Sequence, residues 1–217
     1  MQLVGAPKAS HRFAHVLDGL SRPHHHTNWW DQILHETTHF VVIPTLGAIV
    51  PNWVLAVPKR PLANLSCLTN EERSDLALVI ERVEQVFGDS NLYMFEHGDV
   101  DGGPHACGVD QGHLHLATLS FDLVALAAEA RRSLHWAETY LKIPPVQSDV
   151  GSPYLYVHGQ GRSVISYPAH AQSQWFRRLI AKEARMPEAW DYRTNPFFEN
   201  IHKTIQQFGP TVSSCFC

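Results

Sequence analysis

The segment from Gln111 to Leu119 constrains the fold of this chain more than any other. It reads Gln-Gly-His-Leu-His-Leu-Ala-Thr-Leu, so polar and apolar side chains alternate along most of it. In a β-strand successive side chains point to opposite faces of the sheet, and Gln111, His113 and His115 therefore share one face. The intervening leucines suit a core. The pattern predicts a strand that is buried on one face and lines a pocket with two imidazoles and an amide on the other.

Two imidazoles on one strand face are suited to more than one kind of chemistry. One ring can attack a phosphorus atom while its neighbour stabilises the charge that develops. A His-x-His pair on a strand is also common in zinc sites, where His97 or Cys107 would be candidates for further ligands. A buried pair can also be purely structural. From the spacing alone, all three interpretations of His113 and His115 stay open.

Other segments predict a mixture of strands and helices. Thr69 followed by Glu72 is typical of a capping box, and the apolar residues after it recur at helical spacing. The predicted strands are 40–43, 53–57, 91–96 and 111–119, with a hairpin of 154–157 and 163–167. The predicted helices are 70–87, 121–141, 173–185 and 195–207. Because strands and helices do not alternate regularly, we expect an α+β fold with an antiparallel sheet, packed helices and a C-terminal helical extension.

Composition bounds the domain organisation and the partners. The 217 residues suit an N-terminal arm (1–27), a core (28–145) and a C-terminal hairpin with helices (146–217) that complete the same domain. The net charge is −4 and there is no long basic run, which argues against binding to duplex nucleic acid. No apolar run approaches the roughly 18–20 residues that a membrane-spanning helix needs. We expect a cytoplasmic protein without a membrane contact.

Several short motifs in one order resemble the histidine-triad (HIT) superfamily. Its motif is His-φ-His-φ-His-φ-φ, with φ apolar, and the middle and last histidines match His113 and His115. The segments Phe-Val-Val-Ile-Pro at 40–44, Leu-Ala-Val-Pro-Lys at 55–59 and Phe-Glu-His-Gly at 95–98 resemble family segments upstream of that motif. The resemblance covers about residues 28–120.

The resemblance implies a fold and a reaction. Family members have an antiparallel α+β fold, are often homodimers, and hydrolyse or transfer nucleotides at an α-phosphate. Their middle histidine forms a covalent nucleotidyl intermediate. The resemblance therefore makes His113 the nucleophile, His115 its partner on the phosphate side, and the main-chain carbonyl of Gln111 the group that orients His113. It implies a nucleotide or nucleotide-conjugate substrate, and we expect neither a cofactor nor a resident metal.

The chain also departs from the family pattern. Gln111 replaces the first histidine of the triad, and glutamine can donate a hydrogen bond to a phosphate oxygen but cannot carry a positive charge. Trp53 follows Pro51-Asn52, where the family has Pro-Gly-His, and Glu96 stands near a family amide position. These differences favour a specialised substrate or altered chemistry. A nucleotide-binding protein without turnover, and a metal-dependent enzyme using His113 and His115, are the alternatives.

Six residues are candidates for substrate contacts. Trp53 is a candidate for stacking on a base, although aromatic residues are more often part of a core. Ser173 is expected to cap a helix whose N-terminal amides attract an anion, and Arg177 lies one turn inside that helix, where it can clamp a phosphate. The set is completed by Glu96, His97 and Gln174.

Overall fold

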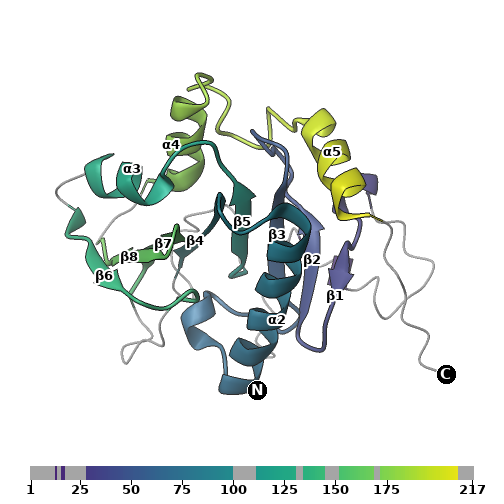
Figure 1. The fold of residues 1–217 in the computed structure, drawn as a ribbon, viewed down its shortest axis with the longest axis horizontal. Helices are drawn as coiled ribbons and strands as arrows, with labels where there is room; N and C mark the ends of the chain where they lie inside the picture. The colour runs from purple at the N-terminus through teal and green to yellow at the C-terminus, as the bar shows by residue number, and fades with distance from the viewer. Residues whose placement is uncertain are drawn as a thin grey trace, which may run out of the picture.

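The computed structural model describes residues 13, 16, 17, 28–99, 111–130, 134–144, 152–168 and 172–209. Within these ranges eight strands form one antiparallel sheet in the order β1-β2-β3-β5-β4-β7-β8-β6 (Figure 1). The strands are β1 (His35–Glu36), β2 (Phe40–Pro44), β3 (Trp53–Pro58), β4 (Leu92–Gly98), β5 (Leu114–Thr118), β6 (Ala137–Thr139), β7 (Tyr154–Gly159) and β8 (Arg162–Ser166). The expected α+β class with an antiparallel sheet is confirmed.

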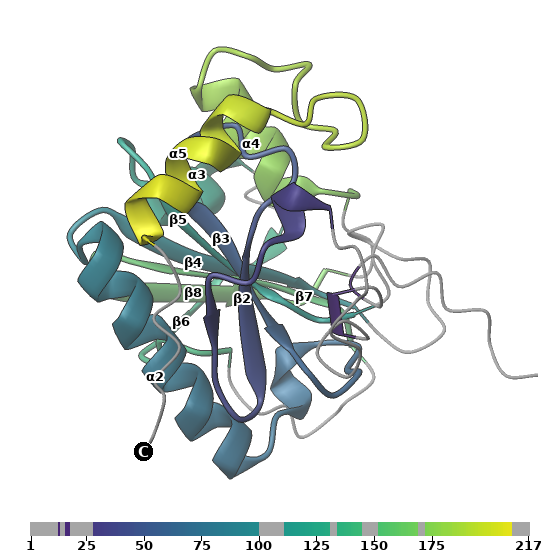
Figure 2. The same cartoon turned by 90° about the vertical axis from the view of Figure 1, so that its right-hand side faces the viewer.

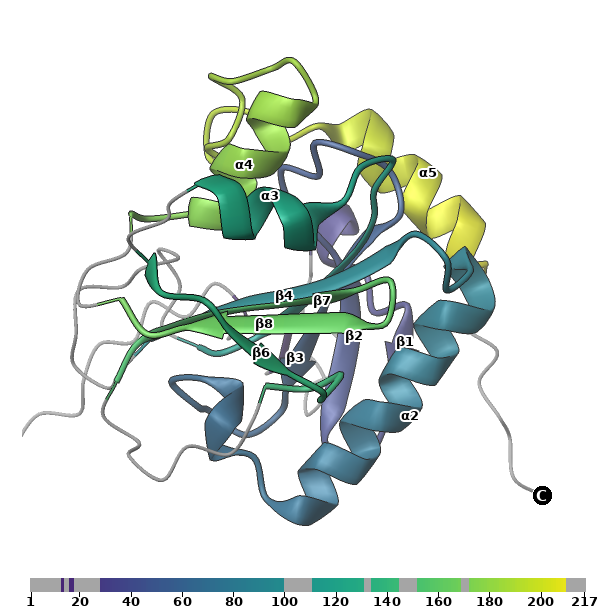
Figure 3. The same cartoon turned by 60° about the vertical axis from the view of Figure 1, so that its left-hand side comes forward.

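Helices pack against both faces of this sheet. The 3-10 turns are η1 (Trp29–Asp31) and η2 (Leu65–Cys67), and the α-helices are α2 (Asn70–Phe87), α3 (Leu123–Ala130), α4 (Trp175–Glu183) and α5 (Phe198–Phe208). Figures 2 and 3 show α2 running along one face, while α3 and α4 cover the other. Within the described ranges, no helix combines the length and apolar character needed to cross a lipid bilayer.

Alternation along the central strands separates two cores. Leu114 and Leu116 of β5 join the cluster under α2, together with Met94 of β4. Ala117 of β5 and Phe95 of β4 join the cluster under α3 and α4. His113 and His115 share the parity of Ala117, so they lie on the α4 side of the sheet. The predicted division between leucines in the core and imidazoles on the opposite face is thus observed.

Helix α2 begins and ends as its sequence predicts. The Thr69 hydroxyl accepts a hydrogen bond from the backbone N–H of Glu72, whose carboxylate in turn accepts one from the Thr69 N–H. This reciprocal capping box satisfies two N–H groups that the first helical turn leaves without intrahelical partners. Arg60 donates two hydrogen bonds to the same carboxylate and, as the main cause, lowers the pKa of Glu72 to about 2.

The predicted helix over 121–141 is wrong in its second half. Helix α3 ends at Ala130, and Ala137–Thr139 form β6, which pairs with β8. The alanine-rich stretch before residue 130 favours a helix, but tertiary pairing with an available sheet edge determines the structure of the residues after it.

The predicted strand over 111–119 is longer than β5, which begins at Leu114. Gly112 accounts for the late start, because its N–H donates to the carbonyl oxygen of Leu62 at 2.6 Å and not to a neighbouring strand. A Cβ at Gly112 would lie 2.6 Å from the Cα of Asn64, so only glycine allows this close approach.

The C-terminal hairpin extends the same sheet. Strand β7 pairs with β4 along five residue pairs. Strand β8 pairs with β7 in a hairpin whose turn lies at Gln160 and Gly161, both of which have a positive φ. Helix α5 is joined to the loop before β3 by the Thr204 hydroxyl, which accepts from the N–H of Asn52 at 2.9 Å. The proposed division at 27/28 and 145/146 stays a prediction, and most of the arm lies outside the described residues.

Candidate active site

His113 is held by the backbone immediately before β5. Its Nδ1 lies 2.8 Å from the main-chain carbonyl oxygen of Gln111. A carbonyl oxygen only accepts hydrogen bonds, so Nδ1 carries the proton, and the lone pair of the neutral ring is on Nε2. The Phe13 ring packs against the imidazole in a T-shaped arrangement, with the two centroids 5.4 Å apart. His113 therefore has a defined tautomer and a defined ring plane.

His115 is enclosed by aromatic rings. The indole N–H of Trp53 donates to its Nδ1 at 3.1 Å. Phe95 stacks on the imidazole with centroids 4.8 Å apart and planes 10° apart, and His113 meets it edge-on, also at 4.8 Å. The two histidines therefore lie side by side, each with its Nδ1 engaged by a different group.

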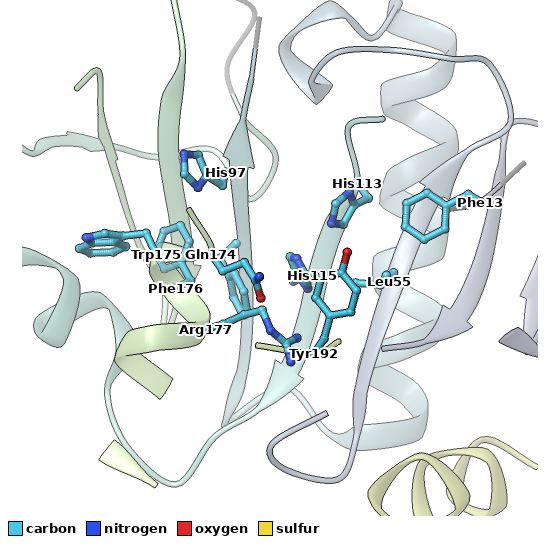
Figure 4. A pocket seen from close by; sticks show the side chains of 11 residues that line it. Phe13, Leu55, His97, His113, His115, Gln174, Trp175, Phe176, Arg177 and Tyr192 are labelled. Atoms are coloured by element: carbon cyan, nitrogen blue, oxygen red, sulfur yellow. The ribbon is translucent and has the colours of Figure 1, made fainter. Parts of the chain in front are cut away.

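Both imidazoles line a cavity between the sheet and the C-terminal segment. It encloses about 490 Å³ of space, counting its open mouth. Figure 4 shows the side chains approaching from β4, from β5 and the residue before it, and from the start of α4. The lining residues are Phe13, Leu55, Phe95, His97, His113, His115, Gln174, Trp175, Phe176, Arg177 and Tyr192. Such a wall, mostly aromatic with a few polar groups, is typical of small-molecule sites.

Comparison with known proteins agrees with this geometry. The sequence model of the family described as the HIT domain matches residues 27–120, which end just after the two histidines. Residues 27–120 form a HIT domain. A search of curated proteins gave no match for the chain.

Solved structures of HIT proteins are similar over part of the chain. A HIT-like protein from Bartonella henselae is 14% identical, covers 52% of this chain and 82% of its own, with a TM-score of 0.39. A histidine triad protein from Clostridium difficile is 17% identical, covers 54% and 96%, with a TM-score of 0.40. A hypothetical histidine triad nucleotide-binding protein from Sulfolobus tokodaii is 11% identical, covers 79% and 90%, with a TM-score of 0.35.

Four of the predicted site residues lie outside the cavity wall: Gln111, Glu96, Trp53 and Ser173. The side-chain amide of Gln111 donates to the carbonyl oxygen of Pro58 at 2.5 Å and is buried there. Only its backbone carbonyl reaches the site, through His113. The amide that replaces the first histidine of the triad therefore connects the segment before β5 to the end of β3.

Glu96 is the second such residue. Strand alternation turns it to the α2 side of the sheet, where its carboxyl group accepts from the N–H of Leu65 at 2.9 Å and from the hydroxyl of Tyr154. Complete burial raises the pKa of Glu96 from 4.5 to about 8, against the lowering effect of these two hydrogen bonds. The carboxyl group is therefore mainly protonated near neutral pH and does not repel a phosphate.

His97, next to Glu96, faces the cavity instead. Burial is the main cause that lowers the pKa of His97 to about 4, with a smaller opposing effect of Asp99. The ring is therefore neutral at physiological pH. The sequence predicted that at most one of these two neighbours faces the pocket, and the structure brings His97 to it.

Arg177 brings a permanent charge to the wall. Its guanidinium group is fixed by bonds to two backbone carbonyls, those of Trp190 at 3.0 Å and of Gly47. It also lies over the Trp53 ring, 4.9 Å from the centroid. Because the side chain is only 5% exposed, the charge is held in place within a largely apolar environment.

The predicted cap at Ser173 is wrong. Helix α4 begins at Trp175, and its N-cap is Gln174, whose backbone is left-handed with a φ of 56° and whose side chain makes no capping hydrogen bond. Ser173 is exposed, and its carbonyl oxygen accepts from Nε of Arg178. Gln174 itself is buried in the cavity wall, and its amide oxygen has no hydrogen-bond partner among the described residues.

Several wall residues were not among the predicted site residues. Phe95 could have been found, because it shares a face of β4 with His97. Phe13 and Tyr192 come from segments without a strand or helix pattern that would orient them. Among the residues that the structure describes, no three His, Cys, Asp or Glu side chains form a metal-binding group. Cys107 lies outside the described residues.

Proposed function

We propose that the protein is a nucleotide-phosphate hydrolase or nucleotidyltransferase that works through a nucleotidyl-histidine intermediate on His113. The observation that carries this proposal is the hydrogen bond between Nδ1 of His113 and the carbonyl oxygen of Gln111. It leaves the lone pair on Nε2, as a nucleophile requires, in a ring that lines a cavity. The family match supports a nucleotide as the ligand.

The reaction then has two displacement steps. Nε2 of His113 attacks the α-phosphorus, a P–N bond forms, and the bond to the leaving group breaks with its electron pair going to that group. The carbonyl of Gln111 stabilises the imidazolium through the Nδ1 proton. In the second step water or another acceptor attacks phosphorus, its proton passes to solvent, and the P–N electron pair returns to Nε2.

The phosphate is expected to lie between the histidines and α4. His115 is beside the nucleophile, and Arg177 supplies a fixed positive charge that favours a phosphate oxygen. The buried amide of Gln174 offers a neutral donor and an acceptor. His97 is neutral at physiological pH and is suited to hydrogen bonding rather than charge pairing. Cytoplasmic location and a homodimer stay predictions.

A second candidate is nucleotide binding without turnover. It is favoured by the position of the Gln111 amide, which is engaged with Pro58 and leaves no side chain of the first triad position in the cavity wall. The two candidates share a ligand class and differ in whether His113 reacts.

A paired binding and turnover experiment tests the proposal. A panel of nucleotides and nucleotide conjugates is first screened by thermal shift, and each ligand that stabilises the protein is then assayed for release of its leaving group. The proposal expects binding by wild type and by His113→Ala, with turnover by wild type alone. Binding without turnover by the wild type, for every ligand in the panel, would support the second candidate. No stabilisation by any nucleotide would contradict both.

A further inference from the structure

We propose that Trp53 is a positioning residue that holds His115 in the neutral form with its proton on Nε2, so that His115 acts as a hydrogen-bond donor and not as a cation. Trp53 is fully buried at the start of β3 and stands where the family pattern has a histidine. Its indole N–H lies 3.1 Å from Nδ1 of His115. The sequence pattern suggested base stacking for this residue, but the contact is an N–H donated to a histidine.

Hydrogen-bond chemistry determines the tautomer. An indole has one N–H and no acceptor, so Nδ1 of His115 must offer its lone pair to Trp53. In the neutral ring the single proton is then on Nε2. Protonation of Nδ1 would set two N–H groups against each other in a buried position and would abolish the bond. A histidine at position 53 could donate or accept, and would impose no such choice.

The groups around Trp53 and His115 also favour the neutral form of His115. The Trp53 ring is held by the Arg177 guanidinium, 4.9 Å from its centroid, and Phe95 stacks on His115 from β4. A second positive charge near Arg177 is unfavourable in a buried site. The titratable or charged groups of the described cavity wall, besides His115 itself, are His97, His113, Arg177 and Tyr192, and none of them is a carboxylate. Arg177, the permanently charged side chain of this part of the wall, therefore disfavours a charged His115.

With this assignment the two histidines carry their protons on different ring nitrogens and are suited to different roles. Nδ1 of His113 donates to a carbonyl, so its Nε2 bears a lone pair, whereas Nε2 of His115 bears a proton. One ring is suited to attack phosphorus and the other to donate to a phosphate oxygen or to the leaving-group atom. This catalytic consequence rests on the function proposed above, but the tautomer of His115 does not.

Nitrogen NMR of the histidine rings in the full chain tests the assignment without a substrate. Long-range proton–nitrogen spectra distinguish protonated from unprotonated ring nitrogens. The chain has 15 histidines, so the His115 signals are identified by their loss in His115→Gln. We expect the wild type to show Nε2 protonated and Nδ1 unprotonated near neutral pH. An Nδ1–H tautomer, or an imidazolium at that pH, would overturn the proposal whether or not any nucleotide is turned over.

Two matched variants test the role of Trp53. Trp53→Phe keeps an aromatic ring and removes the N–H that donates to Nδ1 of His115. Trp175→Phe changes a different buried indole, one that lines the cavity and is not the donor in that bond. In Trp53→Phe the His115 ring should become a tautomer mixture and protonate about one pH unit higher, as loss of one hydrogen bond to the neutral form predicts. Trp175→Phe should leave both properties unchanged.

The result is informative even where a variant is unstable, because the wild-type tautomer is measured independently. Equal tautomer populations and equal titration of His115 in wild type and in a folded Trp53→Phe would refute the role of Trp53. If turnover is established, Trp53→Phe should also change the acidic limb of the rate profile, a change that loss of packing alone does not predict.

Discussion

Glu96→Gln should change how the stability of the protein depends on pH. Burial raises the pKa of Glu96 from 4.5 to about 8, so between these values the folded protein binds a proton that the unfolded chain has released. Stability must then fall as pH rises through this window. The carboxylate accepts from Leu65 and from the Tyr154 hydroxyl. Glutamine resembles the protonated acid, since its oxygen can accept from Leu65 and its amide, like the acid O–H, can donate to the Tyr154 oxygen. The variant should therefore lack this part of the pH dependence.

The size of the effect follows from the two pKa values. One pKa unit corresponds to about 1.4 kcal/mol, so moving from about pH 5.5 to about pH 7.5 should change the wild-type stability relative to Glu96→Gln by about 2.5 kcal/mol. Glu96 is completely buried, so screening by solvent does not reduce this figure. Above the folded pKa the difference should level off, because both states have then lost the proton.

Urea unfolding at several pH values measures the difference directly. Other titrating groups are present in both proteins and cancel in the comparison. Glu129→Gln, at an exposed position of α3, serves as the control for loss of a carboxylate. A wild-type-minus-variant difference that stays constant between about pH 5.5 and pH 7.5 would refute the reasoning that burial keeps Glu96 protonated.

Three further changes test the fold and the site. Thr69→Ala should lower the free energy of unfolding by about 1 kcal/mol in urea melts, because it removes the capping hydroxyl of α2. Gly98→Ala should cost about 3 kcal/mol or prevent folding, measured in the same way, since its Cβ would lie 2.4 Å from the buried ring of Tyr154. Arg177→Met should reduce nucleotide-dependent thermal stabilisation, whereas Arg178→Met, which lies outside the cavity wall, should retain it.

The central strands could be predicted from the sequence because their pattern is strong. Alternation from His113 to Leu116 assigned the imidazoles and the leucines to opposite faces, and the structure has this arrangement. The helix after Thr69 was predictable for a similar reason, since a capping box and a long apolar period agree with each other. Local signals of this kind require no knowledge of the rest of the chain.

Features that depend on distant partners could not be predicted. The segment at 137–139 pairs with β8 instead of continuing α3, and nothing within it identifies that partner. The start of α4 was placed at Ser173 from its capping preference, but the helix begins with Trp175 and Phe176 buried in the core. Burial of two large rings determines the helix start more strongly than one capping side chain.

The candidate site was predictable in its centre and less so in its walls. Trp53 illustrates the limit, because its replacement of a family histidine was visible but its bond to His115 required the paired strands β3 and β5. Gln111 illustrates a second limit. Strand β5 begins three residues later than predicted, and the Gln111 amide donates to the carbonyl oxygen of Pro58 instead of lining the pocket.

Trapping of a nucleotide on His113 tests the central claim most directly. Wild-type protein is mixed with a stabilising nucleotide conjugate, quenched within the first turnover and examined by intact mass and peptide fragmentation under conditions that preserve a P–N bond. We predict an added nucleotidyl group on His113, absent from His113→Ala and still formed, more slowly, in His115→Gln. Turnover without an adduct at any time, or an adduct that persists in His113→Ala, would contradict the account.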